Sequence, residues 1–158
     1  MSSKRVDKAM SVKRAYSFFL VCIAAALVLL CSCSQDINAV APGEGIGVVS
    51  VEVAGPDGET ICSGQAGINS GSTVFDATAY VLYKGKIAFD YTGAGKMVYI
   101  SGINGIYEFD YGAMSGWLYF VNNDTSQTNV GCGAYELSDG DSIRWVYTKD
   151  GGADTGLL

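Results

Sequence analysis

The feature that most constrains this chain is an almost unbroken apolar run near its N-terminus, over residues 16–30. The residues before the run are polar and carry five of the ten basic residues of the chain. A basic stretch followed by about 15 apolar residues is typical of a secretory signal and is short for a membrane span of roughly 20. The run therefore predicts that the folded part of the chain follows it and lies outside the cytoplasm.

Two cysteines follow the run, Cys31 and Cys33. Leu30-Cys31-Ser32-Cys33 resembles a bacterial lipobox, with Leu at −3, a small residue at −1 and the modified Cys at +1. The resemblance implies a thioether from the Cys33 sulfur to diacylglycerol, and cleavage that removes residues 1–32 as a lipoprotein signal peptide. An uncleaved single-span anchor and an ordinary cleaved signal are the alternatives. A lipid anchor with two or more chains holds a protein stably on a membrane, so we expect it on the extracytoplasmic face of the cell membrane.

The charge after the signal excludes nucleic acid as the main partner. From residue 33 onward the chain has 5 basic and 15 acidic residues, a net charge of −10, whereas phosphate binding needs a basic surface. The chain has no histidine. This excludes Ser-His-Asp and Cys-His catalysis, histidine-containing zinc sites and an imidazole ligand to a metal.

The cysteine count predicts one disulfide. Cys22 and Cys31 leave with the signal, and Cys33 takes the lipid, so Cys62 and Cys132 remain. An even number of cysteines in an exported domain favours a bond between them, worth roughly 4 kcal/mol in the chain-entropy model. Two free or buried thiols are the alternative. With no histidine and no CxxC pair, a tetrahedral metal site is not expected.

The exported part reads as strands around one helix, an α+β class. Residues 33–44 are polar and predict a flexible tether, residues 45–149 a domain, and the Gly-rich residues 150–158 a flexible tail. The only helix signal begins at a capping Thr73, with Asp76 three residues later, and stops before Gly85. Short β-branched or aromatic runs predict strands at residues 46–53, 59–62, 87–91, 97–101, 117–121 and 142–148.

Two long motifs carry a family resemblance: residues 115–122 (SGWLYFVN) and residues 131–147 (GCGAYELSDGDSIRWVY). Residues 71–77 and 99–105 precede them in the expected order. Together they resemble the transcobalamin-like C-terminal domain, over roughly residues 46–148. The resemblance implies a β-grasp-like mixed sheet around a single helix. It also implies a corrinoid ligand, because in the vertebrate cobalamin carriers this domain covers one face of the corrin ring. The carriers add a large helical domain that completes the site, so here a partner protein would have to supply it.

The resemblance and the aromatic content together give the candidate ligand-binding residues. Tyrosine and tryptophan offer apolar faces with polar tips, which suit stacking on a corrin, a sugar or a peptide. The alternative is that these aromatics belong to the core, which we favour for Trp145 because it alternates with Ile143 and Tyr147. The candidates are Tyr99, Ser101, Asn104, Trp117, Gly131, Gly133 and Tyr135.

The carboxylates do not predict catalysis or a metal. Asp139 and Asp141 flank Gly140 and suit a turn, and a calcium loop would need more ligands. Glu108 and Asp110 would share a strand face, but a like-charge pair needs burial to shift a pKa. We therefore expect no enzyme and no bound metal.

The sequence thus predicts a lipid-anchored, non-catalytic binding module. Its expected ligand is a corrinoid such as cobalamin, bound together with a partner protein. The alternative is a cell-surface structural or adhesion domain that binds an envelope protein or polysaccharide.

Overall fold

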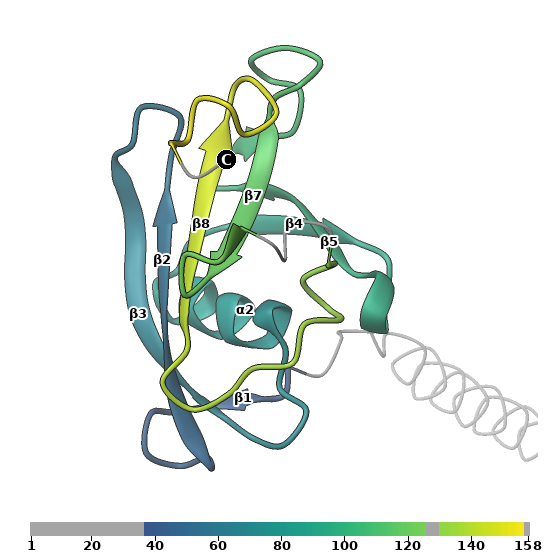
Figure 1. Ribbon diagram of the computed structural model, residues 1–158. Coiled ribbons are helices and arrows are strands. Elements are labelled where there is room, and N and C mark those ends of the chain that lie inside the picture. The colour runs from purple at the N-terminus through teal and green to yellow at the C-terminus, as the bar shows by residue number, and fades with distance from the viewer. Residues whose placement is uncertain (1–36, 126–129, 157–158) are drawn as a thin grey trace, which may run out of the picture. The chain divides into compact units, whose positions relative to one another are not determined.

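The computed structural model describes residues 37–125 and 130–156 (Figure 1). The predicted signal peptide and Cys33 lie outside this part of the chain. No helix among the described residues has the length and apolar character to cross a bilayer. The elements, in chain order, are β1 (Ala39–Val40), β2 (Gly47–Ala54), β3 (Thr60–Ile68), α2 (Val74–Lys84), β4 (Phe89–Thr92), the 3-10 turn η1 (Gly95–Met97), β5 (Tyr99–Ile103), β6 (Ile106–Tyr107), β7 (Gly116–Val121) and β8 (Ser142–Thr148).

The strands form two sheets. The five-stranded sheet has the order β1-β3-β2-β8-β7, and the three-stranded sheet has the order β4-β5-β6. Only the β2–β8 pairing is parallel within the part described; the neighbouring pairs are antiparallel. Helix α2 lies beside the larger sheet (Figure 1). Within the described residues this is a curled mixed sheet with one α-helix, so the α+β prediction is confirmed.

Helix α2 begins where the sequence predicts, because its first turn is capped by local side chains. The Thr73 hydroxyl accepts a hydrogen bond from the Asp76 amide (3.3 Å), and the Asp76 carboxylate accepts one from the Thr73 amide (2.8 Å). This reciprocal pair is a capping box, which satisfies amides that the helix cannot. The same carboxylate accepts from the Asn38 amide (3.0 Å) and so fixes the entry to β1 against the helix.

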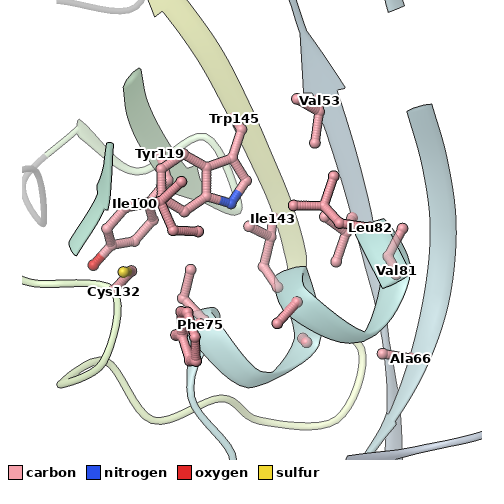
Figure 2. Close-up of a cluster of buried hydrophobic side chains, with 14 of the residues drawn as sticks. Val53, Ala66, Phe75, Val81, Leu82, Ile100, Tyr119, Cys132, Ile143 and Trp145 are labelled. Carbon is pink, nitrogen blue, oxygen red and sulfur yellow. The ribbon is translucent and has the colours of Figure 1, made fainter. Parts of the chain in front are cut away.

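The main core lies between the helix and one face of the larger sheet (Figure 2). Alternate residues of β2 and β8 point into it and are almost fully buried: Val49, Val51, Val53, Ile143, Trp145 and Tyr147. From the helix, Phe75, Val81 and Leu82 pack against them. Strand alternation therefore gives the larger sheet an inner face toward the helix and an outer face away from it.

Both segments expected to be flexible have described structure at the domain's ends. In the tether, Ala39 and Val40 form β1 and pair with Ile68 and Gly67 of β3. In the tail, residues 150–156 form turns. The Thr148 hydroxyl accepts from the Gly152 amide (2.7 Å) and donates to Asp154, whose carboxylate also accepts from the Lys149 amide (2.8 Å).

The disulfide prediction is wrong, because Cys62 and Cys132 are free thiols. Cys62 lies on β3, two residues from Gly64. A Cβ at Gly64 would lie 3.0 Å from Val81, near the end of the helix. The Cys132 carbonyl accepts from the Phe75 amide (2.9 Å) at the start of the helix. Cys62 therefore lies toward the C-terminal end of α2, and Cys132 lies beside its N-terminal end.

Candidate functional site

The structure brings several aromatic side chains together around a pocket of 210 Å³. Its walls come from β5, β7, β8 and the segment that carries Cys132. The lining residues are Tyr99, Trp117, Leu118, Tyr119, Val130, Gly131, Cys132 and Trp145. We call this the aromatic pocket. Of the predicted ligand-binding residues, it collects Tyr99, Trp117 and Gly131.

The aromatic walls are held in place by hydrogen bonds at their polar tips. The Trp117 indole donates to the Ile106 carbonyl (2.9 Å), and the Trp145 indole donates to the Thr78 hydroxyl on the helix (2.9 Å). The Tyr119 hydroxyl donates to the Val130 carbonyl (2.6 Å). Each bond satisfies a group that would be costly to bury alone. The rings are therefore held in place by hydrogen bonds within the protein.

Tyr119 and Trp145 form the inner wall, where they are in register on β7 and β8. Their ring centroids lie 5.3 Å apart, and Figure 2 shows the two rings next to each other above Cys132. Burial raises the pKa of the Tyr119 hydroxyl well above its ordinary value. This wall is apolar and uncharged at neutral pH.

Tyr99 forms the accessible rim, with 42% of its surface exposed. Its hydroxyl donates to the Glu108 carboxylate (2.9 Å). Partial burial, and then this bond, raise the pKa of Tyr99 to about 12. The ring therefore presents a neutral face whose hydroxyl is already committed.

Cys132 lies against the inner wall and is 4% exposed. Its thiol donates to the Val98 carbonyl (3.4 Å). Burial raises the pKa of the thiol to about 11, so it stays protonated and unreactive at neutral pH. Its contribution to the pocket is apolar.

The other predicted ligand-binding residues do not line this pocket. The Ser101 hydroxyl donates to the Asp90 carbonyl (3.3 Å) within the smaller sheet. Asn104 occupies the β5–β6 turn with φ of 54°. Gly133 packs against the η1 turn, where a Cβ would lie 2.2 Å from the Gly95 carbonyl oxygen. Tyr135 packs edge-on against Tyr119, and its carbonyl accepts from the Val74 amide (3.1 Å).

The carboxylates singled out in the sequence bind the protein itself. Asp139 accepts from the Val48 amide (2.8 Å), and Asp141 from the Ser138 amide (2.8 Å), as the turn interpretation predicts. The Glu108 carboxylate accepts a hydrogen bond from the Tyr99 hydroxyl, and the Asp110 carboxylate accepts one from the Tyr107 amide (2.8 Å). Within residues 37–125 and 130–156, no group of three or more histidine, cysteine or acidic side chains could hold a metal ion.

Tyr119 and Trp145 line the pocket, although neither was among the residues predicted to bind a ligand. Trp145 belongs to the core, as predicted, and it also lines the pocket. The signal was present in the alternation: Trp117 and Tyr119 share the inner face of β7, and Trp145 lies opposite Tyr119. Their convergence depended on the β7–β8 register, which the sequence does not show.

A family model described as a domain of unknown function (DUF4430) matches residues 71–149. No curated protein matches the chain. The solved structures that are similar include haptocorrin in complex with Cbi, with 16% identity, a TM-score of 0.50, and coverage of 66% of this chain and 26% of haptocorrin. A protein from Ruminococcus gnavus ATCC 29149, described as a candidate metal-binding protein, has 15% identity and a TM-score of 0.47, and the match covers 65% of this chain and 96% of that one. At these identities the likeness to haptocorrin shows a shared fold.

Proposed function

The chain belongs to the DUF4430 family, and on this premise we propose that it is a lipid-anchored, non-catalytic module that binds a small molecule outside the cytoplasm. The ligand class we propose is a corrinoid. A partner protein covers the part of the ligand that this chain leaves exposed. The aromatic pocket is the contact made by this chain.

The observation that carries the proposal is the aromatic pocket, with rings fixed in advance by hydrogen bonds. Preorganised aromatic surfaces bind a ligand with little loss of conformational entropy. The volume of 210 Å³ is below the range of about 300–1,000 Å³ for sites that enclose a whole ligand. The pocket therefore suits one edge or substituent of a larger ligand.

Two facts support a corrinoid bound in this partial way. The fold is shared with haptocorrin, which was solved in complex with Cbi, and this chain spans 26% of haptocorrin's length. The chain has no histidine, so it offers no imidazole to cobalt. Contact through the ring edge and its substituents, with a second protein opposite, is the arrangement consistent with both facts.

The lipid anchor rests on the sequence motif at Cys33, which lies outside the described residues. Mass spectrometry of the protein purified from membranes tests it. We expect a mature N-terminus at Cys33 that carries a diacylglycerol thioether. A Cys33→Ser variant recovered on the membrane with the same added mass would contradict the assignment.

Intrinsic fluorescence tests ligand binding, because both tryptophans of the chain line the aromatic pocket. We expect cobinamide to quench their emission in the full-length protein, with a saturable change in the corrinoid absorbance spectrum as a second readout. Tyr99→Ala removes the rim of the pocket and should weaken binding about tenfold, the scale of one lost aromatic contact.

Tyr83→Ala is the matched control, because Tyr83 is 75% exposed on the helix and does not line the aromatic pocket. Equal affinity of the Tyr99→Ala and Tyr83→Ala variants for cobinamide would show that the aromatic pocket is not the binding site. No spectral change at high micromolar cobinamide, with the partner present, would remove the corrinoid.

A surface role is the second candidate function, favoured by the loop between β6 and β7. Phe109 and Met114 are 62% and 63% exposed there. The loop is braced: the Ser115 hydroxyl donates to the Gly112 carbonyl (2.8 Å), and the Tyr147 hydroxyl donates to the Tyr107 carbonyl (2.8 Å). Phe109 keeps a φ of 70°, an uncommon backbone conformation for an aromatic residue. A rigid loop that exposes apolar side chains suits a protein partner.

Recovery of envelope proteins with the full chain and with Phe109→Ala tests this role. A protein that the full chain recovers, that Phe109→Ala loses and that Tyr83→Ala retains would support the surface role. Equal recovery by both variants would exclude this loop as the contact.

A further inference from the structure

A second pocket, of 460 Å³, lies on the larger sheet next to the β2–β3 turn. Its lining joins the ends of β2 and β8, the β2–β3 turn and the turns that follow β8. The residues are Ala54, Gly55, Pro56, Asp57, Gly58, Arg144, Val146, Tyr147, Lys149, Asp154 and Thr155. We call it the Arg144 pocket. Unlike the aromatic pocket, it is within the size range of sites that hold a whole small ligand.

Arg144 is the group in this pocket whose bonding is incomplete. It alternates with Ile143 and Trp145 on β8, so its side chain lies on the outer face of the sheet. Its Nε atom is shut off from solvent and has no hydrogen-bond partner. A buried charged donor without an acceptor is costly. Native proteins rarely keep one unless an ion, a water molecule or a ligand completes it.

The neighbouring charges leave Arg144 as the available cation. Lys149 is already paired with Asp57 (2.9 Å) and lies 5.0 Å from the ring centroid of Tyr111. The Asp154 carboxylate accepts bonds from Thr148 and from the Lys149 amide. Glu52 is in register with Arg144 on β2, yet no ion pair joins the two among the residues that the structure describes.

These charges also decide which anion fits. A guanidinium binds a carboxylate through two parallel N–H bonds. Because Nε is closed to solvent, these bonds would come from the two terminal nitrogens of the partly exposed Arg144 side chain. A phosphate dianion in the pocket would meet the Arg144 guanidinium and the carboxylates of Asp57 and Asp154, so repulsion disfavours it more than it disfavours a monoanion. The carbon side chains of Ala54, Pro56 and Val146 offer an apolar floor.

We propose that the Arg144 pocket binds a small monocarboxylate with a short apolar body, with the carboxylate on the Arg144 guanidinium and the apolar body on Ala54, Pro56 and Val146. This site is separate from the aromatic pocket, because the two share none of their lining residues. The inference does not depend on the proposed corrinoid function.

Nitrogen-15 NMR of the full chain in detergent micelles tests the proposal, with butyrate as the probe. The chain has three arginines, Arg5, Arg14 and Arg144, and Arg144→Gln identifies the Arg144 Nε–H signal by its loss. We expect butyrate to shift that signal saturably. Butyramide, the uncharged analogue, should leave it in place, and phosphate should shift it less than butyrate does. No shift with butyrate, or an equal shift with butyramide, would overturn the proposal.

Calorimetric titration of variants separates the guanidinium fork from charge alone. Arg144→Lys keeps the charge and loses the fork, so butyrate should bind about tenfold more weakly. Lys96→Gln is the control, since it removes a cation that does not line the pocket, and its affinity should match the unmodified chain. Far-UV circular dichroism establishes that each variant is folded. Unchanged affinity in Arg144→Lys, or an equal loss in Lys96→Gln, would show that Arg144 is not the ligand-binding group.

Discussion

The two faces of the larger sheet differ in how completely their polar groups are bonded. On the inner face, the buried indole and hydroxyl groups of Trp117, Tyr119 and Trp145 each have a partner. On the outer face, the buried cluster is small (Ala54, Phe120 and Val146), and the Arg144 Nε beside it has no partner. Under the two proposals, the inner pocket, whose polar groups are satisfied, would bind by shape and stacking, and the outer pocket, with its unpaired guanidinium, would bind by charge.

Trp145→Ala should have the largest effect on stability. The side chain is 3% exposed, packs on Tyr119, and its indole bonds Thr78. Its removal leaves a cavity between sheet and helix, so the free energy of unfolding should fall by about 3–5 kcal/mol. Urea denaturation followed by far-UV circular dichroism measures this. Trp145→Phe fills most of the space and should cost less; equal losses would mean that the packing of the inner face matters little.

Phe120→Ala tests the outer face and should cost about 3 kcal/mol, the lower end of the range for a buried aromatic. Phe120 is 1% exposed, but its buried cluster has only a few members, so its removal leaves a smaller cavity than that of Trp145. The same denaturation experiment measures it. A loss larger than that of Trp145→Ala would reverse the proposed order of the two faces.

The local features of this fold were predictable because they depend on neighbouring residues. Thr73 and Asp76 are three residues apart, and the capping box they form was visible as spacing. The strand alternation of Ile143, Trp145 and Tyr147 also gave the inner face directly. β1 could not be predicted, because a two-residue strand has no periodicity and exists only through its pairing with β3.

The long-range features were not predictable to the same degree. An even number of cysteines favoured a disulfide, but Cys62 and Cys132 lie toward opposite ends of the helix. The resemblance placed Tyr99, Trp117 and Gly131 in one site, and they do line one pocket. The resemblance groups Ser101 and Gly133 with them, but the Ser101 hydroxyl bonds to the Asp90 carbonyl and Gly133 packs against η1, so neither lines the pocket.

Tyr99→Phe, at the rim of the aromatic pocket, should change how the unfolding free energy of the protein depends on pH in the alkaline range. The pKa of Tyr99 is raised to about 12 by burial and by the bond to Glu108. The neutral hydroxyl therefore contributes stability below the unfolded-state pKa of about 10, and the contribution is lost as pH rises toward the folded-state value. We expect a smaller loss of unfolding free energy between about pH 9 and pH 12 in Tyr99→Phe than in the unmodified chain. Burial also raises the pKa of Tyr119 and Cys132, so only the difference between the two pH profiles reports on Tyr99. Parallel profiles would therefore refute the assignment to Tyr99.

Asp154→Asn should have the smallest effect, and at the opposite end of the pH scale. Bonds from the Thr148 hydroxyl and the Lys149 amide hold the pKa of Asp154 below its ordinary value. The ionised form therefore contributes stability above about pH 4, which is lost as pH falls through the folded-state pKa. Urea midpoints measured from pH 7 down to about pH 3 should fall less steeply in Asp154→Asn. An identical acid profile would mean that the turns after β8, and with them one wall of the Arg144 pocket, do not depend on this carboxylate.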